Sequence, residues 1–171
     1  GLSMAEMLEA PHRLEKQDDR VRFESGAGEL DDWFARFAWQ NQRANNAVTY
    51  VSKLGERVVG YYAIAAAGVS HADAGDEFSR RRPDPIPCVL LARLAVDRRA
   101  QGRGVGAALF RDALERALSV SQGMGAACLL IHCRDEAARA FYLRHVDAIQ
   151  SPIDDLQLVV PMKAIADQLL K

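Results

Sequence analysis

The order of apolar patterns along the chain predicts one α/β (α+β) domain in which helices flank a mixed central β-sheet. Three observations lead to this fold class. Apolar residues recur at helical spacing in several segments, and short apolar runs typical of buried strands alternate with those segments. The 171 residues contain no repeat, low-complexity tract or linker that would divide the chain.

The helical and extended patterns follow one another in a definite order. Residues 29–44 show helical spacing, with Leu30, Trp33 and Phe34 on one face and acidic residues in the first turn. The aromatic residues of this helix are expected to pack in the core. Further helices are expected at 104–118, 136–144 and 164–170, and strands at 49–52, 58–65, 88–96, 126–133 and 156–162. The polar, Arg- and Pro-rich residues 70–87 predict a loop or a short irregular insertion.

The composition is that of a globular protein without a membrane span, at 49% hydrophobic and 26% charged residues. Residues 1–4 resemble a cloning remnant before a natural start at Met4, so the domain is expected to span residues 5–171. No signal-peptide pattern precedes it, and we expect a cytoplasmic protein.

The chain has an odd number of cysteines, and all of them lie in apolar stretches: Cys88, Cys128 and Cys133. This pattern predicts buried reduced thiols and no metal site.

Positive charge is concentrated in one part of a chain whose formal net charge is only -1. Between residues 80 and 116 there are nine arginines and four acidic residues, a local surplus of five positive charges. A surplus of this kind attracts phosphate, and a solvated basic face is the alternative interpretation. The arginines are Arg80, Arg81, Arg82, Arg93, Arg98, Arg99, Arg103, Arg111 and Arg116.

A glycine-rich segment, residues 98–106, connects a predicted buried strand to a predicted helix. Gly102, Gly104 and Gly106 allow the backbone to approach a ligand closely. A helix that begins there directs unpaired N–H groups and the positive end of its dipole toward one point. Phosphate is the ligand that such a point favours, and the neighbouring arginines add positive charge.

Two other phosphate-binding motifs do not fit this segment. A P-loop needs Lys and then Ser or Thr after the last glycine, where this chain has Ala107 and Ala108. A dinucleotide fingerprint needs an acidic residue at the end of the next strand, where this chain has His132 and Cys133. The segment instead resembles the pyrophosphate loop of GNAT N-acetyltransferases, Gln/Arg-x-x-Gly-x-Gly/Ala, with Gln101, Gly104 and Gly106 at its fixed places.

This resemblance implies a GNAT-like domain that uses acetyl-CoA as co-substrate and needs no metal. It implies that the pantetheine arm pairs with the backbone of Leu94 and Val96, at the end of a strand that splays from its neighbour. It also implies that the pyrophosphate lies on residues 101–106. The expected acetyl-CoA contacts are Leu94, Ala95, Val96, Arg99, Gln101, Gly102, Arg103, Gly104, Val105 and Gly106.

Further segments are similar to the GNAT-type toxins of bacterial toxin–antitoxin modules. They lie at residues 23–26, 30–33, 41–43, 58–62, 93–97, 135–142 and 151–152. This resemblance implies acetylation of the α-amine of aminoacyl-tRNA, a block of translation, and neutralisation by a ribbon–helix–helix antitoxin. Residues 145–150 depart from the family, which has a Gly-Phe pair there. We therefore expect the turn at these residues, and part of the acceptor pocket, to differ from those of the family.

Tyr142 is the predicted catalytic residue. A tyrosine, with a pKa of about 10, stays protonated at neutral pH and can donate its proton to a departing thiolate. Packing beside Phe141 is the alternative role. No general base stands out, and His132 is expected to lie in the core. An α-amine with a pKa near 8 needs little help, since roughly a fifth of it is neutral at pH 7.4, against about 0.1% for lysine.

Two other functions remain open at this stage. One is acetylation of a small-molecule amine or a protein amine; the other is a non-catalytic CoA-binding module. The oligomeric state is also open, with a homodimer among the alternatives.

Overall fold

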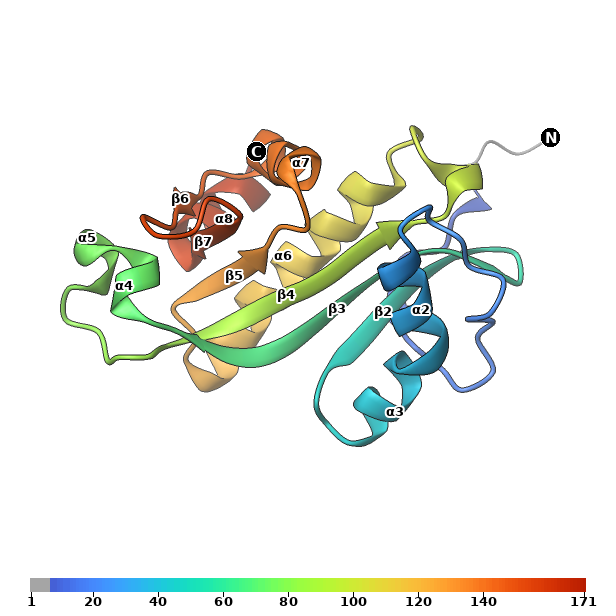
Figure 1. The fold of residues 1–171 in the computed structure, drawn as a ribbon, viewed down its shortest axis with the longest axis horizontal. Helices are drawn as coiled ribbons and strands as arrows, with labels where there is room; N and C mark the ends of the chain where they lie inside the picture. Colours follow the sequence, from blue (N-terminus) through green and yellow to red (C-terminus); the bar gives the residue numbers. More distant parts are fainter. Residues whose placement is uncertain (1–6) are drawn as a thin grey trace. The chain divides into compact units, whose positions relative to one another are not determined.

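A computed structural model describes residues 7–171 of the chain, so the predicted remnant at residues 1–4 and the start of the domain lie outside the described residues. The chain forms its elements in the order β1 (His12–Arg13), α2 (Gly28–Arg36), α3 (Ala38–Arg43), β2 (Val48–Leu54), β3 (Arg57–Val69), α4 (His71–Ala74), α5 (Asp76–Ser79), β4 (Ile86–Val96), the 3₁₀ turn η1 (Arg98–Ala100), α6 (Val105–Met124), β5 (Cys128–His132), α7 (Glu136–His145), β6 (Ile149–Gln150), β7 (Gln157–Pro161) and α8 (Met162–Leu169). Figure 1 shows these elements along the chain.

The described strands form a seven-stranded sheet in the order β1-β2-β3-β4-β5-β7-β6. Strands β4 and β5 run parallel, whereas β1–β2, β2–β3, β5–β7 and β6–β7 are antiparallel pairs. The predicted mixed sheet is therefore confirmed. The contacts divide the chain into two compact units, one with residues 1–65 and 93–112, the other with residues 66–92 and 113–171. Strands β3 and β4 and helix α6 each contribute residues to both.

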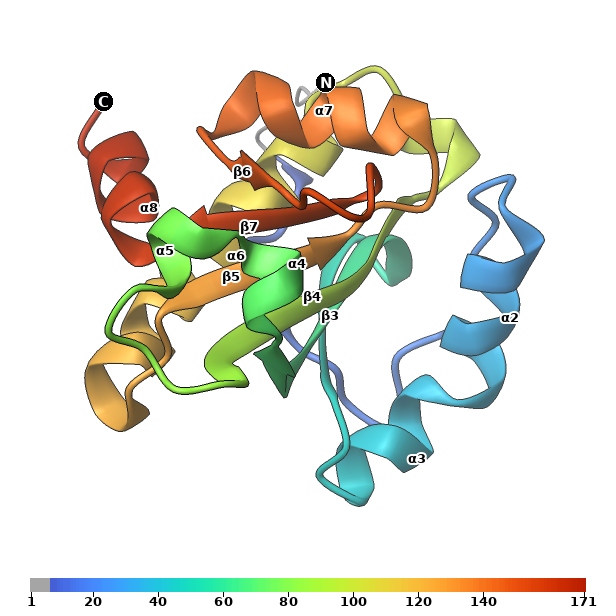
Figure 2. The same ribbon diagram turned by 60° about the vertical axis from the view of Figure 1, so that its left-hand side comes forward.

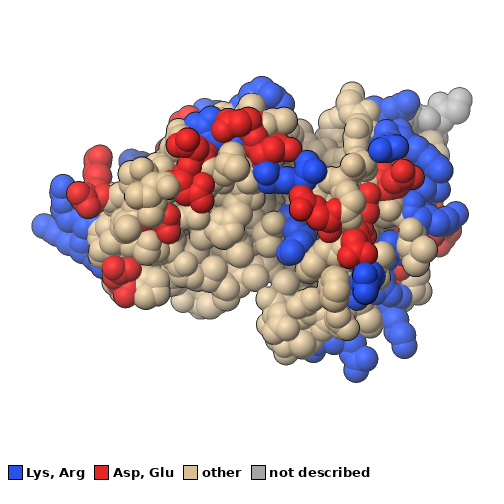
Figure 3. All heavy atoms as spheres, in the orientation of Figure 1, with Lys and Arg blue, Asp and Glu red and all other residues tan. Residues whose placement is uncertain are grey.

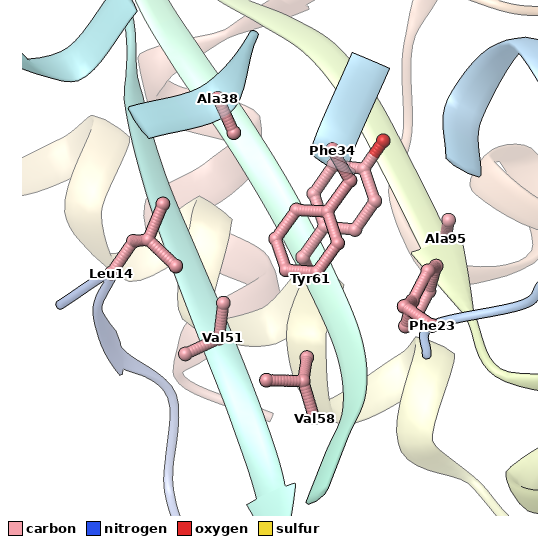
Figure 4. Close-up of a cluster of buried hydrophobic side chains, with 8 residues drawn as sticks. All are labelled: Leu14, Phe23, Phe34, Ala38, Val51, Val58, Tyr61 and Ala95. Atoms are coloured by element: carbon pink, nitrogen blue, oxygen red, sulfur yellow. The ribbon is translucent and has the colours of Figure 1, made fainter. Parts of the chain in front are cut away.

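The first unit contains the meander β1–β2–β3 and a core that α2 and α3 complete. Phe34 of α2 and Tyr61 of β3 are both fully buried. Their rings stack with centroids 4.4 Å apart, and Phe23 meets Phe34 edge-on at 5.1 Å. Figure 4 shows the two stacked rings among Leu14, Ala38, Val51, Val58 and Ala95. The apolar face predicted for residues 29–44 thus packs on the sheet, but the expectation that all its aromatic residues lie in the core was wrong for Phe37, which is 37% exposed.

The neighbouring residues Tyr61 and Tyr62 point to opposite faces of β3, yet both are fully buried. The Tyr61 hydroxyl donates to the carbonyl of Leu30 in α2 at 2.7 Å, and the Tyr62 hydroxyl donates to the Asp112 carboxylate of α6. Helices therefore cover both faces of the strand here. Neither tyrosine therefore faces solvent, although strand geometry places them on opposite faces.

Close packing of α6 on β3 depends on Gly60. A Cβ at this position would lie 2.7 Å from a methyl carbon of Leu109 and 3.1 Å from one of Val105. The missing side chain lets the first turns of α6 approach the strand. The start of α6, where the glycine-rich segment ends, is thereby fixed against the sheet of this unit.

The second unit holds the remaining strands and α7, α8, α4 and α5 (Figure 2). Strand β5 pairs in parallel with β4 over Cys88–Leu91 and antiparallel with β7. Residues 92–96 of β4 lie beyond its ladder with β5. The core of this unit gathers Val69, Ala74, Ile86, Cys88, Cys128, Leu130 and Val159. All three cysteines are buried and free, as the sequence predicted.

Several boundaries differ from those predicted. Residues 29–44 form two helices because the backbone leaves helical geometry at Phe37, where φ is −121°, and the Asn41 side-chain amide donates to the Phe37 carbonyl. Residues 70–87 contain the one-turn helices α4 and α5, and a Ser70 side chain that accepts from the Asp73 N–H caps the first. Helix α6 runs six residues past the predicted end, to Met124. Within residues 7–171, no helix has the length and apolar character needed to cross a membrane.

Phe34→Ala should lower the free energy of unfolding by about 3–5 kcal/mol, because a fully buried ring stacked on Tyr61 would be lost. Urea denaturation measures this change. The control is Val21→Ala, since Val21 is 83% exposed and its truncation should change stability by less than about 0.5 kcal/mol. Equal midpoints for the two variants would contradict the core described here.

Candidate acetyl-CoA site

The glycine-rich segment follows β4 as a turn and then opens α6. Gly102 and Gly104 have φ angles of +77° and +84°, which lie in the left-handed region that favours glycine. Nothing lies within 4 Å of a Cβ built on either residue, so both face open space. Helix α6 begins at Val105, one residue after the predicted start, and the N–H groups of its first turn have no partner within the helix.

Asp97 fixes the beginning of this turn although its side chain is only 1% exposed. Its carboxylate accepts from the Arg99 N–H at 3.0 Å and from the Glu24 N–H at 3.0 Å. Its own N–H donates to the carbonyl of Val59 in β3 at 2.8 Å. Asp97 therefore connects the turn and the segment that precedes α2 through its carboxylate, and β3 through its backbone N–H.

Gln101 and Arg98 also tie residues 24 and 25 to the turn. The Gln101 side-chain amide donates to the carbonyls of Ser25 and Val96, at 2.8 and 2.9 Å. The Arg98 N–H donates to the Glu24 carbonyl at 2.8 Å, and the two side chains form an ion pair at 3.4 Å. Gln101 thus holds the turn in shape from the side, and the charge of Arg98 is paired with Glu24.

The segment 24–26 is in turn fixed to α2. The Asp31 carboxylate accepts from both the N–H and the hydroxyl of Ser25. Beyond it, Arg93 of β4 lies over the Trp33 ring, with its guanidinium carbon 4.3 Å from the ring centroid. Trp33 therefore packs against the core and also presents a ring face to a cation.

Arg99, Gln101, Gly102, Arg103 and Gly104 are exposed, and Val105 is buried. The first unit brings these residues together with Leu94, Ala95, Val96 and Gly106 in one continuous stretch from the end of β4 to α6. Ala95 is 5% exposed and belongs to the aromatic core, so only its backbone is available to a ligand. Basic side chains surround this turn, and a second group surrounds α5 (Figure 3).

These features fit a diphosphate group. Open space at two glycines, unpaired N–H groups at a helix start and the exposed guanidinium groups of Arg99 and Arg103 are what a bound phosphate needs. No group of three His, Cys, Asp or Glu side chains that could hold a metal ion occurs among residues 7–171.

Tyr142 belongs to the other unit, on α7, and is 6% exposed. Its ring meets Phe141 edge-on at 5.3 Å. Burial, with a smaller contribution from Cys133, raises the pKa of Tyr142 above its ordinary value near 10, so the phenol is protonated at neutral pH. His132, in contrast, ends β5; the expectation of a core histidine was wrong, since its side chain reaches solvent at the strand end whereas residues 128–131 are buried.

The profile of the Acetyltransferase (GNAT) family matches residues 8–146. The chain belongs to this family. The GNAT fold and the acetyltransferase class predicted from the glycine-rich segment are thereby confirmed.

Several known proteins are similar to this GNAT chain over most of its length. It is 43% identical over 154 residues to the tRNA-acetylating toxin of Mycobacterium tuberculosis (strain ATCC 25618 / H37Rv), covering 90% of this chain and 92% of the toxin. The structure of AtaT complexed with acetyl-methionyl-tRNAfMet matches with a TM-score of 0.84 and 26% identity, over 96% of this chain and 99% of the other. AtaTR bound with AcCoA matches with a TM-score of 0.79 and 25% identity, over 97% and 99%.

Sequence reasoning named the GNAT glycines but missed the role of Asp97. An Asp placed directly before a turn of arginines is an N-cap signal, and its side chain does accept from the Arg99 N–H. The second partner, the Glu24 N–H, lies 73 residues away in the chain and has no local signal.

Asp97→Ala should lower the free energy of unfolding by about 1–3 kcal/mol, because two backbone N–H groups lose their acceptor. Amide hydrogen exchange should accelerate at Glu24 and Arg99. Asp32→Ala is the control: its exposed pair with Arg36 at 3.5 Å should contribute nothing measurable. Unchanged exchange at both amides would show that the turn does not depend on Asp97.

Proposed function

We propose that this chain transfers the acetyl group of acetyl-CoA to the α-amine of aminoacyl-tRNA and so acts as a toxin that blocks translation. The observation that carries the proposal is the 43% identity to a tRNA-acetylating toxin over 90% of this chain. The likeness to AtaT complexed with acetyl-methionyl-tRNAfMet supports the same acceptor.

We propose that acetyl-CoA binds along the end of β4 and the start of α6. The pyrophosphate would lie on the N–H groups of residues 102–106, with Arg99 and Arg103 supplying charge and Gln101 keeping the turn in shape. The backbone of Leu94, Ala95 and Val96 would hold the pantetheine arm, since these residues lie beyond the ladder between β4 and β5. Bound there, acetyl-CoA supplies the acetyl group as a thioester.

Tyr142 is the proposed general acid. Transfer to an amine requires a proton for the departing thiolate, and a phenol whose pKa is raised by burial keeps its proton at every physiological pH. A raised pKa also makes the phenol a weaker acid. Proton transfer is therefore favourable only toward a thiolate that is itself poorly hydrated, as in a closed substrate complex.

An aminoacyl acceptor fits a site without an assigned general base. A free α-amine has a pKa near 8, so an appreciable part is neutral at physiological pH, whereas a lysine amine with a pKa of about 10.4 must first lose a proton. The amine of an aminoacyl ester is activated further by the ester group.

Two groups of exposed arginines are available to bind phosphate groups. Arg80, Arg81 and Arg82 follow α5 in the second unit, and all three are exposed. Arg82 also packs on the Phe78 ring at 4.4 Å. We propose that this group docks the acceptor stem, whereas Arg99 and Arg103 serve the co-substrate. A cytoplasmic location follows from the acceptor. A ribbon–helix–helix antitoxin is the expected partner, in line with the structure of an AtaT mutant toxin bound to the C-terminus of the antitoxin AtaR.

Gly104→Glu should abolish measurable acetyl-CoA binding while the fold persists. The substitution puts a carboxylate into the open space beside Gly104 and forces a side chain onto a φ of +84°. Calorimetry with acetyl-CoA measures the affinity. The matched control is Gly55→Glu, which has a φ of +59° and equally open surroundings in the β2–β3 turn. Wild-type affinity in Gly104→Glu would refute the site.

Tyr142→Phe should retain acetyl-CoA binding and lower turnover by ~10²–10⁴-fold, since only the phenolic proton is removed. The control is Tyr50→Phe, which keeps the ring that stacks on Tyr62 at 5.2 Å. Single-turnover kinetics with saturating acetyl-CoA separates binding from chemistry. If Tyr142→Phe works at the wild-type rate, the proton comes from elsewhere.

Acetylation of charged tRNA should fall steeply as salt rises, whereas acetylation of a small free amine should not, because phosphate docking releases counterions. Reversing Arg80 and Arg81 to Glu should weaken tRNA modification and reduce the log–log salt slope by about one per lost phosphate contact, with acetyl-CoA affinity unchanged. Arg82 is left in place because it packs on Phe78.

Lys163→Glu, an exposed charge reversal on α8, is the matched control and should leave the salt slope unaltered. The labelled product released from the tRNA ester by base should be an N-acetyl amino acid. If charged tRNA is not acetylated at low salt while a lysine peptide or a polyamine is, the proposed acceptor is wrong and the family assignment alone stands.

A further inference from the structure

Two buried thiols lie directly opposite each other on neighbouring strands of the second unit. Cys88 of β4 and Cys128 of β5 are register partners in the parallel ladder. Adjacent strands are about 4.7–4.9 Å apart, which falls within the Cα separation of about 4.4–6.8 Å that a disulfide spans. Side chains of register partners point to the same face, and both cysteines belong to one core cluster.

Each of the two thiols affects the pKa of the other. Cys128 lowers the pKa of the Cys88 thiol, whereas Cys88, together with burial, raises the pKa of Cys128. Cys88 is also the one with some exposure, 4% against 0% for Cys128. Cys88 is therefore the thiol from which a first oxidation step would proceed.

Small molecules can reach the edge of this cluster. A pocket of about 260 Å³ is lined by Ile86, Ala127 and Pro87, among others. Ile86 belongs to the core cluster that contains both thiols, Ala127 packs against that cluster, and Pro87 precedes Cys88. Arg82 lines the same pocket, and its charge lowers the pKa of Cys128 against the larger opposing effects. The pocket thus gives access from solvent to the edge of the core cluster that contains both thiols.

From this arrangement we propose that Cys88 and Cys128 form a dithiol site that a peroxide oxidises reversibly to a disulfide. The Cys88 thiolate attacks one oxygen of hydrogen peroxide; the O–O bond breaks, and the released hydroxide takes up a proton to become water. The resulting Cys88 sulfenic acid is attacked by the Cys128 sulfur. The S–S bond forms, the S–O bond breaks, and a second water leaves with the Cys128 proton. Two thiols and one peroxide give one disulfide and two waters.

Cys133, one residue past the end of β5, is an internal control. It is 7% exposed, and burial raises the pKa of its thiol to about 11. The other two thiols are register partners of each other, so Cys133 lacks a partner thiol with which to close a disulfide. The proposed oxidation therefore consumes two of the three thiols and leaves a defined third one. This inference does not depend on the acceptor proposed above.

The test uses the whole chain and hydrogen peroxide, with free glutathione in the same solution as a reference thiol. After quenching, the protein is denatured in N-ethylmaleimide and weighed by mass spectrometry. We expect one maleimide adduct instead of three, a tryptic fragment that links Cys88 to Cys128, and the return of all three adducts after dithiothreitol. Cys133→Ser should fall from two adducts to none, and Cys128→Ser should form no intrachain disulfide.

Three results would overturn the proposal. Wild-type protein could keep three adducts under conditions that oxidise glutathione completely. The lost adducts could include Cys133. Dithiothreitol could also fail to restore them, which would indicate sulfinic acid and not a disulfide. The wild-type measurement decides the matter even if a serine variant fails to fold.

Discussion

The buried carboxylate of Asp97 is the interaction on which the candidate site depends. It accepts hydrogen bonds from Arg99, two residues onward, and from Glu24, 73 residues back, while the Asp97 backbone is bonded to Val59. Three stretches of chain therefore meet at one residue, two through its side chain and one through its backbone. A glycine-rich turn has little rigidity of its own, because glycine loses more conformational freedom on folding than any other residue. Because both flanks of the turn are fixed before a ligand binds, less conformational entropy is lost on binding.

Polar and apolar contacts stabilise different parts of the first unit. Hydrogen bonds from Gln101, Arg98 and Ser25 set the path of the turn and of the segment before α2. The stack of Phe34 on Tyr61 and the absent side chain of Gly60 set how closely the helices lie on β3. Because the apolar contacts fix the helices against β3, the turn itself can remain exposed, as a phosphate-binding segment must be.

Local sequence patterns predicted the elements whose causes are local. The glycines at 102 and 104 were identified because glycine readily adopts the positive φ angles that this turn requires. The residue patterns of α2 and α7 predicted helices that are present. The sequence did not reveal that Tyr61 and Tyr62 are both buried, since this depends on α6 covering the second face of β3. The two-residue strands β1 and β6 are too short to show a periodicity. The partner of Asp97 at Glu24 arises only from the folded chain.

The central claim is that the fixed turn between Asp97 and α6 holds the pyrophosphate of acetyl-CoA. The most direct measurement is the ¹H–¹⁵N NMR spectrum of the whole chain during titration with acetyl-CoA and, separately, with pantetheine, which lacks the phosphates. We predict that acetyl-CoA shifts the amide signals of residues 102–106 most strongly and that these signals saturate together, whereas pantetheine leaves them in place. Saturable binding of acetyl-CoA with the amides of residues 102–106 unmoved would contradict the claim.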